Sequence, residues 1–405
     1  MRERKAYVLG LGAVGLAGAL TVAAFAAPEQ AAAAARPYTP AAAGDVVATV
    51  PRRDPREVAE RQLLAQAPDR VEVAVALARA DIGRSRALSD PRYLGRAQAT
   101  LARWWALPMP PPDVLLLRAT IEQSLHDFHG ARRDLDQLIA VRPADAQAHL
   151  TRAVVATVTA DYAAARGSCD ALVALAPAIV VAACRAPLDA LGGHAADAYA
   201  ALARAVDDPR ADAGLRLWAT TTLAELAIQR GDEALAAGHL RAVLAADPSD
   251  TYARAALADV LVEQHQYAEA SALTAGYEAI DNLLVRRAIA EHAAGGPDAG
   301  KLAQMMHERI AAAAERGDRV HMREEAMFAL AVDGDAARAL ELARANWDVQ
   351  KELADARIFA AAATAAGDRA AAAPVIAWLD ANGVADARLD RILGRTGTAI
   401  AGGAR

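Results

Sequence analysis

The chain has 405 residues, of which 113 are alanine, whereas aromatic residues make up 4%. Strands favour β-branched and aromatic side chains, so this composition disfavours an enzyme built on a β-sheet. The apolar content of 55% is too high for a disordered chain. A formal charge of −6 over the whole length argues against nucleic acid as a partner. Composition therefore predicts an alanine-rich, all-helical protein.

The amino-terminal segment has the pattern of an export signal. Arg4 and Lys5 precede an uncharged run from Ala6 to Ala27, which contains the small-x-small tripeptide Ala24-Phe25-Ala26. A basic start, an apolar run and small residues are typical of a secretory signal peptide. A helix over this run would be about 33 Å long, which also suits an uncleaved membrane anchor. Either interpretation of residues 1–27 predicts a periplasmic or other extracytoplasmic location, with the membrane as a partner only through this anchor.

Three further regions follow the export segment. Residues 28–55 are rich in Ala and Pro, which predicts a disordered tether. Residues 56–385 carry a helical repeat and are expected to form the folded body of the protein. Residues 386–405 predict a short capping helix followed by a flexible, Gly-rich tail.

A repeat with a period near 34 residues runs through the folded region. Ala131, Ala165, Ala198, Ala236 and Ala270 are separated by 34, 33, 38 and 34 residues, and each lies at the start of a helical run after a turn. Four of these runs are followed by a proline, at Pro143, Pro177, Pro209 and Pro248. Proline cannot continue a helix, so each unit is predicted to be two helices joined by a turn. One such hairpin cannot bury its apolar face alone, and neighbouring hairpins must therefore stack.

This pattern resembles the tetratricopeptide repeat (TPR), which combines small and bulky residues at fixed places and ends in Pro. The matching positions are Leu115, Ala119, Ala131, Leu135 and Pro143 in one unit, and Leu257, Ala258, Tyr267 and Ala270 in another. The units lack the early Trp of the family, and a residue followed by Ala replaces its Leu-Gly pair, so they are degenerate copies. The resemblance, to an exported bacterial TPR protein, implies an all-α fold: a right-handed α-solenoid of stacked antiparallel helix pairs, with about eight or nine units.

In TPR proteins the first helix of each unit lines the concave side of the solenoid. By that analogy the groove-facing residues would be Leu116, Thr120, Gln123, Leu150, Val154, Thr157, Thr221, Glu225, Ile228, Asp259 and Val262. The set is mixed and mildly acidic, and it lacks the Lys/Asn/Arg clamp with which some TPR proteins hold a peptide carboxylate. The resemblance implies a protein or peptide segment as the partner. For any one of these residues, ordinary solvated surface is the alternative.

The two cysteines are predicted to lie at the same height on neighbouring antiparallel helices. Cys169 and Cys184 flank a turn centred near Ala176-Pro177, at about equal distances along the chain. In an oxidising compartment this geometry favours a disulfide. Two unbonded cysteines in contact within the core are the alternative. Nearby Pro187 falls inside a predicted first helix, which it is expected to kink.

The sequence contains no motif that carries catalysis or holds a cofactor. Gly-rich phosphate loops, His-Glu-x-x-His and Cys-x-x-Cys do not occur. His126 and His129 could share a metal by spacing, but solvent-exposed residues of a helix–helix turn explain them better. We therefore expect no enzyme activity, no cofactor and no metal.

Two functions remain. The favoured one is a non-enzymatic extracytoplasmic TPR scaffold that binds a protein partner through the concave face of the solenoid. The alternative is a structural or assembly subunit of an envelope machine for polysaccharide or the outer membrane, in which the chain acts as a membrane-anchored spacer.

Overall fold

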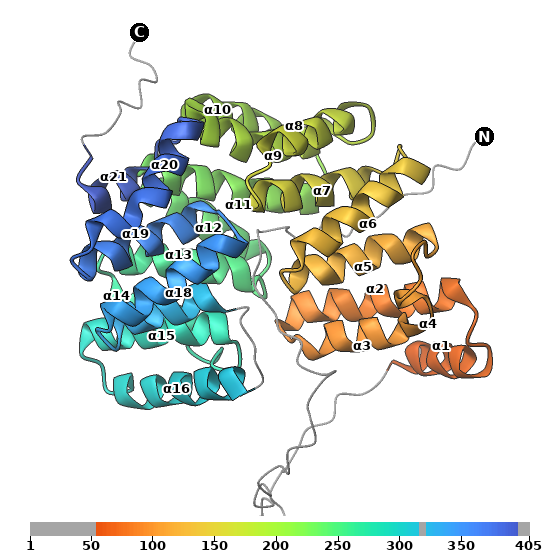
Figure 1. Ribbon diagram of the computed structural model, residues 1–405, viewed down its shortest axis with the longest axis horizontal. Coiled ribbons are helices and arrows are strands. Elements are labelled where there is room, and N and C mark those ends of the chain that lie inside the picture. The colour runs from red at the N-terminus through yellow and green to blue at the C-terminus, as the bar shows by residue number, and fades with distance from the viewer. Residues whose placement is uncertain (1–53, 316–320, 396–405) are drawn as a thin grey trace, which may run out of the picture.

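The computed structural model describes residues 54–315 and 321–395, and the regular elements of this part of the chain are all helices (Figure 1). The predicted signal peptide or anchor at residues 1–27, residues 28–53 of the predicted tether and residues 396–405 of the predicted tail lie outside the described residues. Within the described ranges, no helix is both long enough and apolar enough to cross a bilayer.

The helices of the first half are α1 (Pro55–Gln66), α2 (Val71–Leu88), α3 (Arg92–Thr100), α4 (Ala102–Trp105), α5 (Pro112–Ser124), α6 (Phe128–Val141), α7 (Ala146–Val158), α8 (Tyr162–Ala171), η1 (Leu172–Ala174), α9 (Ala178–Asp189), η2 (Ala190–His194) and α10 (Ala195–Val206). Those of the second half are α11 (Ala213–Arg230), α12 (Glu233–Ala246), α13 (Thr251–Glu263), α14 (Tyr267–Thr274), α15 (Asp281–Ala294), α16 (Ala299–Glu315), α17 (Met322–Ala331), α18 (Ala336–Val349), α19 (Leu353–Ala365), η3 (Arg369–Ala372), α20 (Ala373–Asn382) and α21 (Ala387–Leu393).

Aspartate side chains start many of these helices. Asp127, Asp145, Asp161 and Asp250 each precede a helix and accept a hydrogen bond from a backbone N–H in its first turn. An aspartate in this position satisfies a donor that the helix itself leaves free, and its charge complements the positive end of the helix dipole. The repeated aspartates therefore set the helix boundaries that produce the period in the sequence.

The turn inside several helix pairs has the same left-handed backbone geometry. His126, Ala160 and His265 have φ angles of 60°, 60° and 58°, and each stands between the first and second helix of its pair. Gly231 occupies the same place after α11 with φ of 82°. This residue reverses the chain, so that the second helix of a pair runs antiparallel to the first.

Successive helices pack against one another in chain order, in the helix pairs α2/α3, α5/α6, α7/α8, α9/α10, α11/α12, α13/α14, α15/α16, α17/α18 and α19/α20. Ala119, Ala131 and Ala165 are fully buried between these helices, and small side chains there allow close approach of the backbones. Leu115 and Leu135 fill the space around them in a shared core cluster. The predicted all-α solenoid of stacked antiparallel helix pairs is confirmed.

The expected irregularity at Pro187 takes a different form from a simple kink. Helix α9 runs through Pro187 to Asp189 and then widens into the π-helical turn η2. Gly193 ends this turn with φ of 86°, a left-handed conformation that glycine adopts without strain. The α9/α10 pair is therefore joined by a broader turn than its neighbours.

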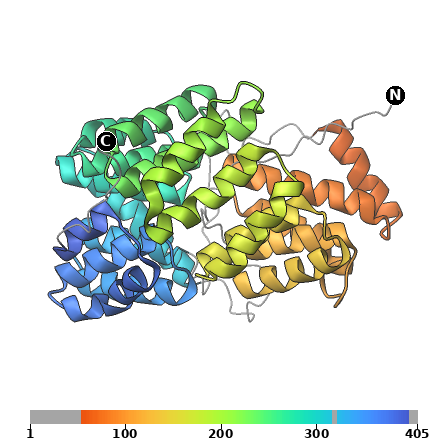
Figure 2. The ribbon, with the colours of Figure 1, turned by 90° about the horizontal axis from the view of Figure 1, so that it is seen from above.

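The carboxy-terminal helices fold back onto the middle of the array (Figures 1 and 2). The backbone N–H of Lys351 donates to the carbonyl oxygen of Val158 over 2.8 Å. The Nε2 of Gln229 donates to the carbonyl oxygen of Ala385 over 3.0 Å. Leu191 of η2 belongs to the same core cluster as residues of α17 to α21. These contacts join units that are far apart in the sequence, so on this side the array closes on itself.

Candidate functional site

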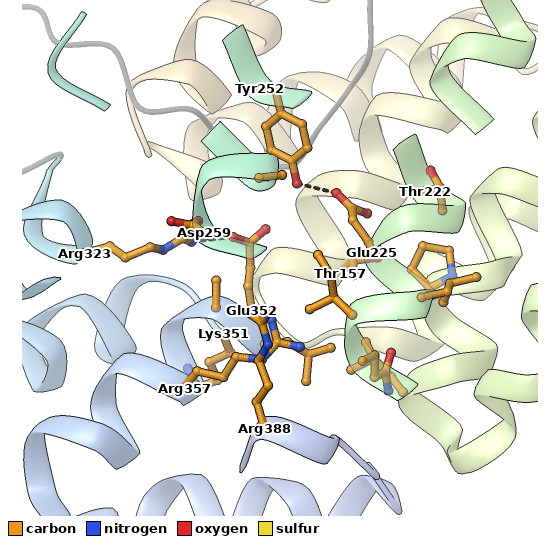
Figure 3. Close-up of a pocket in the computed structure, with 18 residues that line it drawn as sticks. Thr157, Thr222, Glu225, Tyr252, Asp259, Arg323, Lys351, Glu352, Arg357 and Arg388 are labelled. Atoms are coloured by element: carbon orange, nitrogen blue, oxygen red, sulfur yellow. Dashed lines mark hydrogen bonds and ion pairs between the residues drawn. The ribbon is translucent and has the colours of Figure 1, made fainter. Parts of the chain in front are cut away.

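A cavity of about 190 Å³ lies where the array closes (Figure 3). One wall comes from α7, α9, η2, α11 and α13, and the other from α17, α19, α21 and the turn before α19. Pro187, the irregular residue of α9, is part of the first wall. Segments separated by more than a hundred residues along the chain thus meet around one space.

The predicted groove residues fall into three groups. Thr157, Glu225, Ile228 and Asp259 line the cavity. Five others are partly buried outside it, namely Leu116, Thr120, Gln123, Val154 and Val262. Leu150 and Thr221 are 3% and 2% exposed and lie in the core, so they do not face a groove and their prediction is wrong. Leu150 packs in the cluster of α9 to α11, and the hydroxyl of Thr221 donates to the carbonyl oxygen of Leu217 on its own helix.

The acidic side of the cavity is formed by Glu225 of α11 with Tyr252 of α13. The Tyr252 hydroxyl donates a hydrogen bond to Oε1 of Glu225. Burial raises the pKa of Glu225, because the charged carboxylate is taken out of water, while the hydrogen bond from Tyr252 lowers it by a smaller amount. Burial also raises the pKa of Tyr252, so this side chain stays a hydrogen-bond donor. Glu225 is therefore a largely buried carboxyl group, and no cation of the described residues is directly bonded to it.

A second carboxyl group, Glu352, caps the start of α19 and shares one cation with a neighbour. Arg323 of α17 pairs with Glu352 and donates through Nε to Oδ1 of Asp355 over 2.6 Å. Burial, partly offset by Arg323, raises the pKa of Glu352 to about 7. The Oε1 atom of Glu352 is buried and receives no hydrogen bond from residues 54–315 or 321–395.

Three cations stand on the other side, at the lower edge of Figure 3: Lys351, Arg357 and Arg388. Arg357 donates through Nε to Asp386 over 3.2 Å and is neutralised by that partner. Arg388 of α21 is only 8% exposed, yet its Nε and Nη2 atoms have no hydrogen-bond partner in the part of the chain that the structure describes. Its nearest carboxylate, Glu233, is 3.6 Å away, too far for a hydrogen bond. Burial, with a contribution from Arg357, lowers the pKa of Arg388.

Sequence analysis missed the carboxy-terminal half of this site. Tyr252, Arg323, Lys351, Glu352 and Arg388 did not enter the predicted groove, because an open solenoid keeps those units apart from α11 and α13. One signal was available: Lys351 is one of three lysines in a chain with 44 basic residues, and it adjoins Glu352. Two adjacent charged residues at the start of a helix, in an otherwise alanine-rich segment, indicate a candidate polar site.

The predicted disulfide is confirmed and supports one wall of the cavity. Cys169 of α8 is bonded to Cys184 of α9, with 5.7 Å between their Cα atoms. Pro187 stands one turn further along α9. The bond therefore ties the helix that carries Pro187 to the preceding unit.

The paired histidines differ from their prediction. His126 is not solvent-exposed: its ring stacks on Phe128 with centroids 5.3 Å apart, and its Nε2 is buried. Burial lowers its pKa to about 4, so the ring is neutral near pH 7. His129, in contrast, is exposed. The part of the chain that the structure describes brings together no three side chains of His, Cys, Asp or Glu placed to hold a metal ion.

No protein-family model and no curated protein matches the chain. Among solved structures, it is similar to the TPR domain of P58(IPK), with 14% identity over 77% of this chain and 92% of that one and a TM-score of 0.20. It is also similar to the structure of Naa15/Naa10 bound to HypK-THB, with 14% identity over 82% of this chain and 61% of that one and a TM-score of 0.22. Overlaps of this quality carry no argument about function.

The arrangement of the helices identifies the fold. Antiparallel pairs joined by tight turns follow one another with a period near that of TPR units, and small residues occupy their close contacts. The fold is TPR-like. Its departure from an open solenoid is the closure that forms the cavity.

Proposed function

We propose that the chain is a non-enzymatic extracytoplasmic scaffold that binds a protein or peptide segment along the first helices of its amino-terminal units. The observation that supports this is a strip of partly exposed side chains on α5 and α7. Leu116, Thr120 and Gln123 follow one another at spacings of four and three residues, so they share one face of α5, and each is partly exposed. Val154 continues the strip on α7, which contacts α5 and carries Thr157 at the cavity.

The composition of this strip suits an extended or helical segment of another protein. It combines two apolar side chains with a hydroxyl and an amide, which provide both apolar contact and hydrogen bonds without a strong charge. The hydroxyl of Thr120 donates to the carbonyl oxygen of Leu116 on its own helix, so its remaining capacity is that of an acceptor.

Site-specific photocrosslinking tests the proposal. Gln123 and Val154 are replaced in turn by p-benzoylphenylalanine in the producing cell, and Glu341 on α18, whose side chain is 70% exposed, is the control position. We expect a crosslinked protein of the same mass from Gln123 and Val154 and none from Glu341. Equal capture at all three positions, or capture at Glu341 alone, would contradict a partner on the α5–α7 strip.

The extracytoplasmic location is supported by the disulfide between Cys169 and Cys184 together with the apolar run in residues 6–27. Disulfides persist mainly in oxidising compartments. The mass of the mature protein tests this part: cleavage near Ala27 indicates a signal peptide, and an intact amino terminus in the membrane fraction indicates an anchor. A cytosolic, full-length product would contradict both.

A role as a spacer in an envelope assembly is the second candidate, and the closure supports it. Contacts such as that of Lys351 with Val158 give the array a fixed form, which suits a part that holds other components at a set distance. In that role Gln123→Arg and Val154→Glu leave function intact, whereas removal of residues 1–27 abolishes it. The scaffold proposal expects loss of function from the two substitutions as well.

A further inference from the structure

The cavity contains charged groups that keep buried polar atoms without hydrogen-bond partners among the described residues, although Arg388 lies 3.6 Å from Glu233 and Glu352 pairs with Arg323. Its size suits a small molecule: about 190 Å³ is many times the roughly 10–15 Å³ that a single water molecule needs on the same measure. Apolar side chains of Leu226, Ile228 and Leu353 form part of its lining, and exposed Ala354 stands at its rim. An apolar space with a few polar groups and an open rim is the usual form of a small-ligand site.

The cationic side offers free donors. Arg388 is more than nine-tenths buried, and two of its guanidinium nitrogens lack hydrogen-bond partners. A buried charged donor without a partner is unfavourable, and a ligand anion would satisfy it. Lys351 adds a second cation that makes no ion pair with the described residues. Arg357 is already occupied by Asp386 and serves to close that side.

The carboxyl side of the cavity instead offers hydrogen-bond acceptors. Among the described residues, Glu225 receives one hydrogen bond, from Tyr252, and Oε1 of Glu352 receives none. Asp259 is not available, because Arg286 pairs with it over 2.7 Å. Arg323 is shared between Glu352 and Asp355. Glu225 and Glu352 therefore remain as acceptors for a cationic group, next to the ring of Tyr252.

In the close-up, Glu225 and Tyr252 lie on one side and Arg357 and Arg388 on the other, while Glu352 and Lys351 are neighbours between them (Figure 3). An anion alone would leave Glu225 without a bonded cation and Oε1 of Glu352 without a donor, although Arg323 pairs with the Glu352 carboxylate. An amine alone would leave Nε and Nη2 of Arg388 without a hydrogen-bond acceptor among the described residues. We propose that the cavity binds a small zwitterion, with its ammonium group at Glu225 and Glu352, its carboxylate at Arg388 and Lys351, and a short apolar body between them. This is a site separate from the protein-binding strip on α5 and α7, and it does not depend on it.

The ionisation of the cavity agrees with such a ligand. Burial raises the pKa of Glu352 to about 7, with Arg323 of α17 lowering it and Asp355 of α19 and Glu225 of α11 raising it. An ammonium group nearby favours the ionised carboxylate. Binding near pH 7 should therefore release a proton from Glu352 to the solvent.

Isothermal titration calorimetry on the full chain tests the proposal with defined probes. Leucine, the dipeptide Gly-Leu and ε-aminocaproate carry the same two charges at increasing separation, and caproate and hexylamine each lack one charge. We expect one zwitterion of the three to bind with one site per chain and at least about tenfold more tightly than caproate or hexylamine. No binding by any zwitterion, or equal binding by caproate or hexylamine alone, would overturn the proposal.

Variants separate the two ends of the site. Arg388→Gln and Glu352→Gln should each weaken binding of the zwitterion by about tenfold or more. Arg395→Gln, which removes an arginine paired with Asp380 outside the cavity, should leave it unchanged. Where Arg388→Gln lowers the folded fraction in circular dichroism, Lys351→Gln replaces it, since Lys351 is partly exposed and makes no ion pair with described residues.

Proton release supplies a readout that a structural role would not change. The binding enthalpy is measured at pH 7 in two buffers with different ionisation enthalpies. The native chain should release protons, and Glu352→Gln should release fewer. Binding without proton release, or unchanged release in Glu352→Gln, would contradict the assignment of the ammonium group to this carboxyl.

Discussion

The indole Nε1 of Trp378 donates a hydrogen bond to the phenolic oxygen of Tyr162 over 2.9 Å, although the two residues are 216 positions apart in the chain. Tyr162 begins α8, and Trp378 lies in α20. The ring of Trp378 also packs edge-on against Trp347, with 5.4 Å between centroids. A specific pair of side chains thus joins the last helix pair to the middle of the array. Closure of the array therefore depends on this side-chain contact as well as on the curvature of the stacked helix pairs.

Removing the acceptor of this bond should loosen the closure. Tyr162→Phe keeps the ring and leaves the indole N–H of Trp378 without a partner, which costs about 1–3 kcal/mol of the free energy of unfolding. Urea titration measures the loss. Tyr267→Phe is the control, because the hydroxyl of Tyr267 bonds the exposed His265 only two residues away. Equal losses in the two variants would show that the bond to Trp378 does not contribute to closure.

The disulfide should contribute measurably to stability. Cys169 and Cys184 close a loop with a sequence separation of 15, for which the chain-entropy model gives about 3 kcal/mol. The double variant Cys169→Ser, Cys184→Ser should lose about this amount, and reductant should lower the native chain to the same level. Added reductant should not change the double variant. If reductant leaves the native chain unchanged, the bond does not stabilise the fold.

The features that could be predicted from the sequence are those with a local cause. The aspartate caps, the alanines at close contacts and the turns recur in many of the units, so the period shows the helix pairs directly. Cys169 and Cys184 flank one turn, and their equal distances from it bring them together. These relationships are set within one or two units and need no knowledge of the whole array.

The cavity, in contrast, does not follow from contacts within one or two units. It requires α19 and α21 to reach α11, and this depends on small rotations between successive pairs that add up over the array. Spacing within a unit predicted a shared face for Glu225 and Asp259, which both line the cavity, but it did not show that Glu352 and Arg388 would line it too. Leu150 was misplaced because its side chain packs in the cluster of α9 to α11, and Thr221 because it lies in the core with its hydroxyl bonded to its own helix.

Stability should fall as the pH rises toward neutrality, in part because of Glu122. Burial and the neighbouring Asp134 raise the pKa of Glu122 to about 7, from an ordinary value of 4.5. The folded state therefore holds this proton up to about pH 7, whereas the unfolded chain loses it near pH 4.5. The folded state binds more protons than the unfolded chain in this interval. The contribution of Glu122 to the free energy of unfolding is therefore complete below about pH 4.5 and is lost as the pH rises to about 7.

Glu122→Gln tests this sign. The variant carries no ionisable group at that place, so its free energy of unfolding should depend less steeply on pH between about 4.5 and 7 than that of the native chain. Denaturant titrations across the interval measure the slopes. Glu341→Gln, on the exposed face of α18, is the control and should follow the native curve. A steeper slope in Glu122→Gln would contradict the raised pKa.

The closure also limits the side chain at Gly193. Gly193 and Gly276 have φ angles of 86° and 84°, so replacement of either by alanine forces a side chain into the left-handed region at a cost of about 1–2 kcal/mol. The new Cβ at Gly193 would lie 3.0 Å from the carbonyl oxygen of Gly383, whereas at Gly276 it would meet nothing within 4 Å.

Because the φ angles of Gly193 and Gly276 match, the difference in free energy of unfolding between the two variants isolates the contact with Gly383. We expect Gly193→Ala to lose more free energy of unfolding than Gly276→Ala in urea titration. Hydrogen exchange of the backbone amides in α21 should also accelerate in Gly193→Ala alone, since moving Gly383 displaces the helix that follows it. Equal losses, with α21 equally protected in both, would mean that the approach of Gly193 to Gly383 does not hold the array closed.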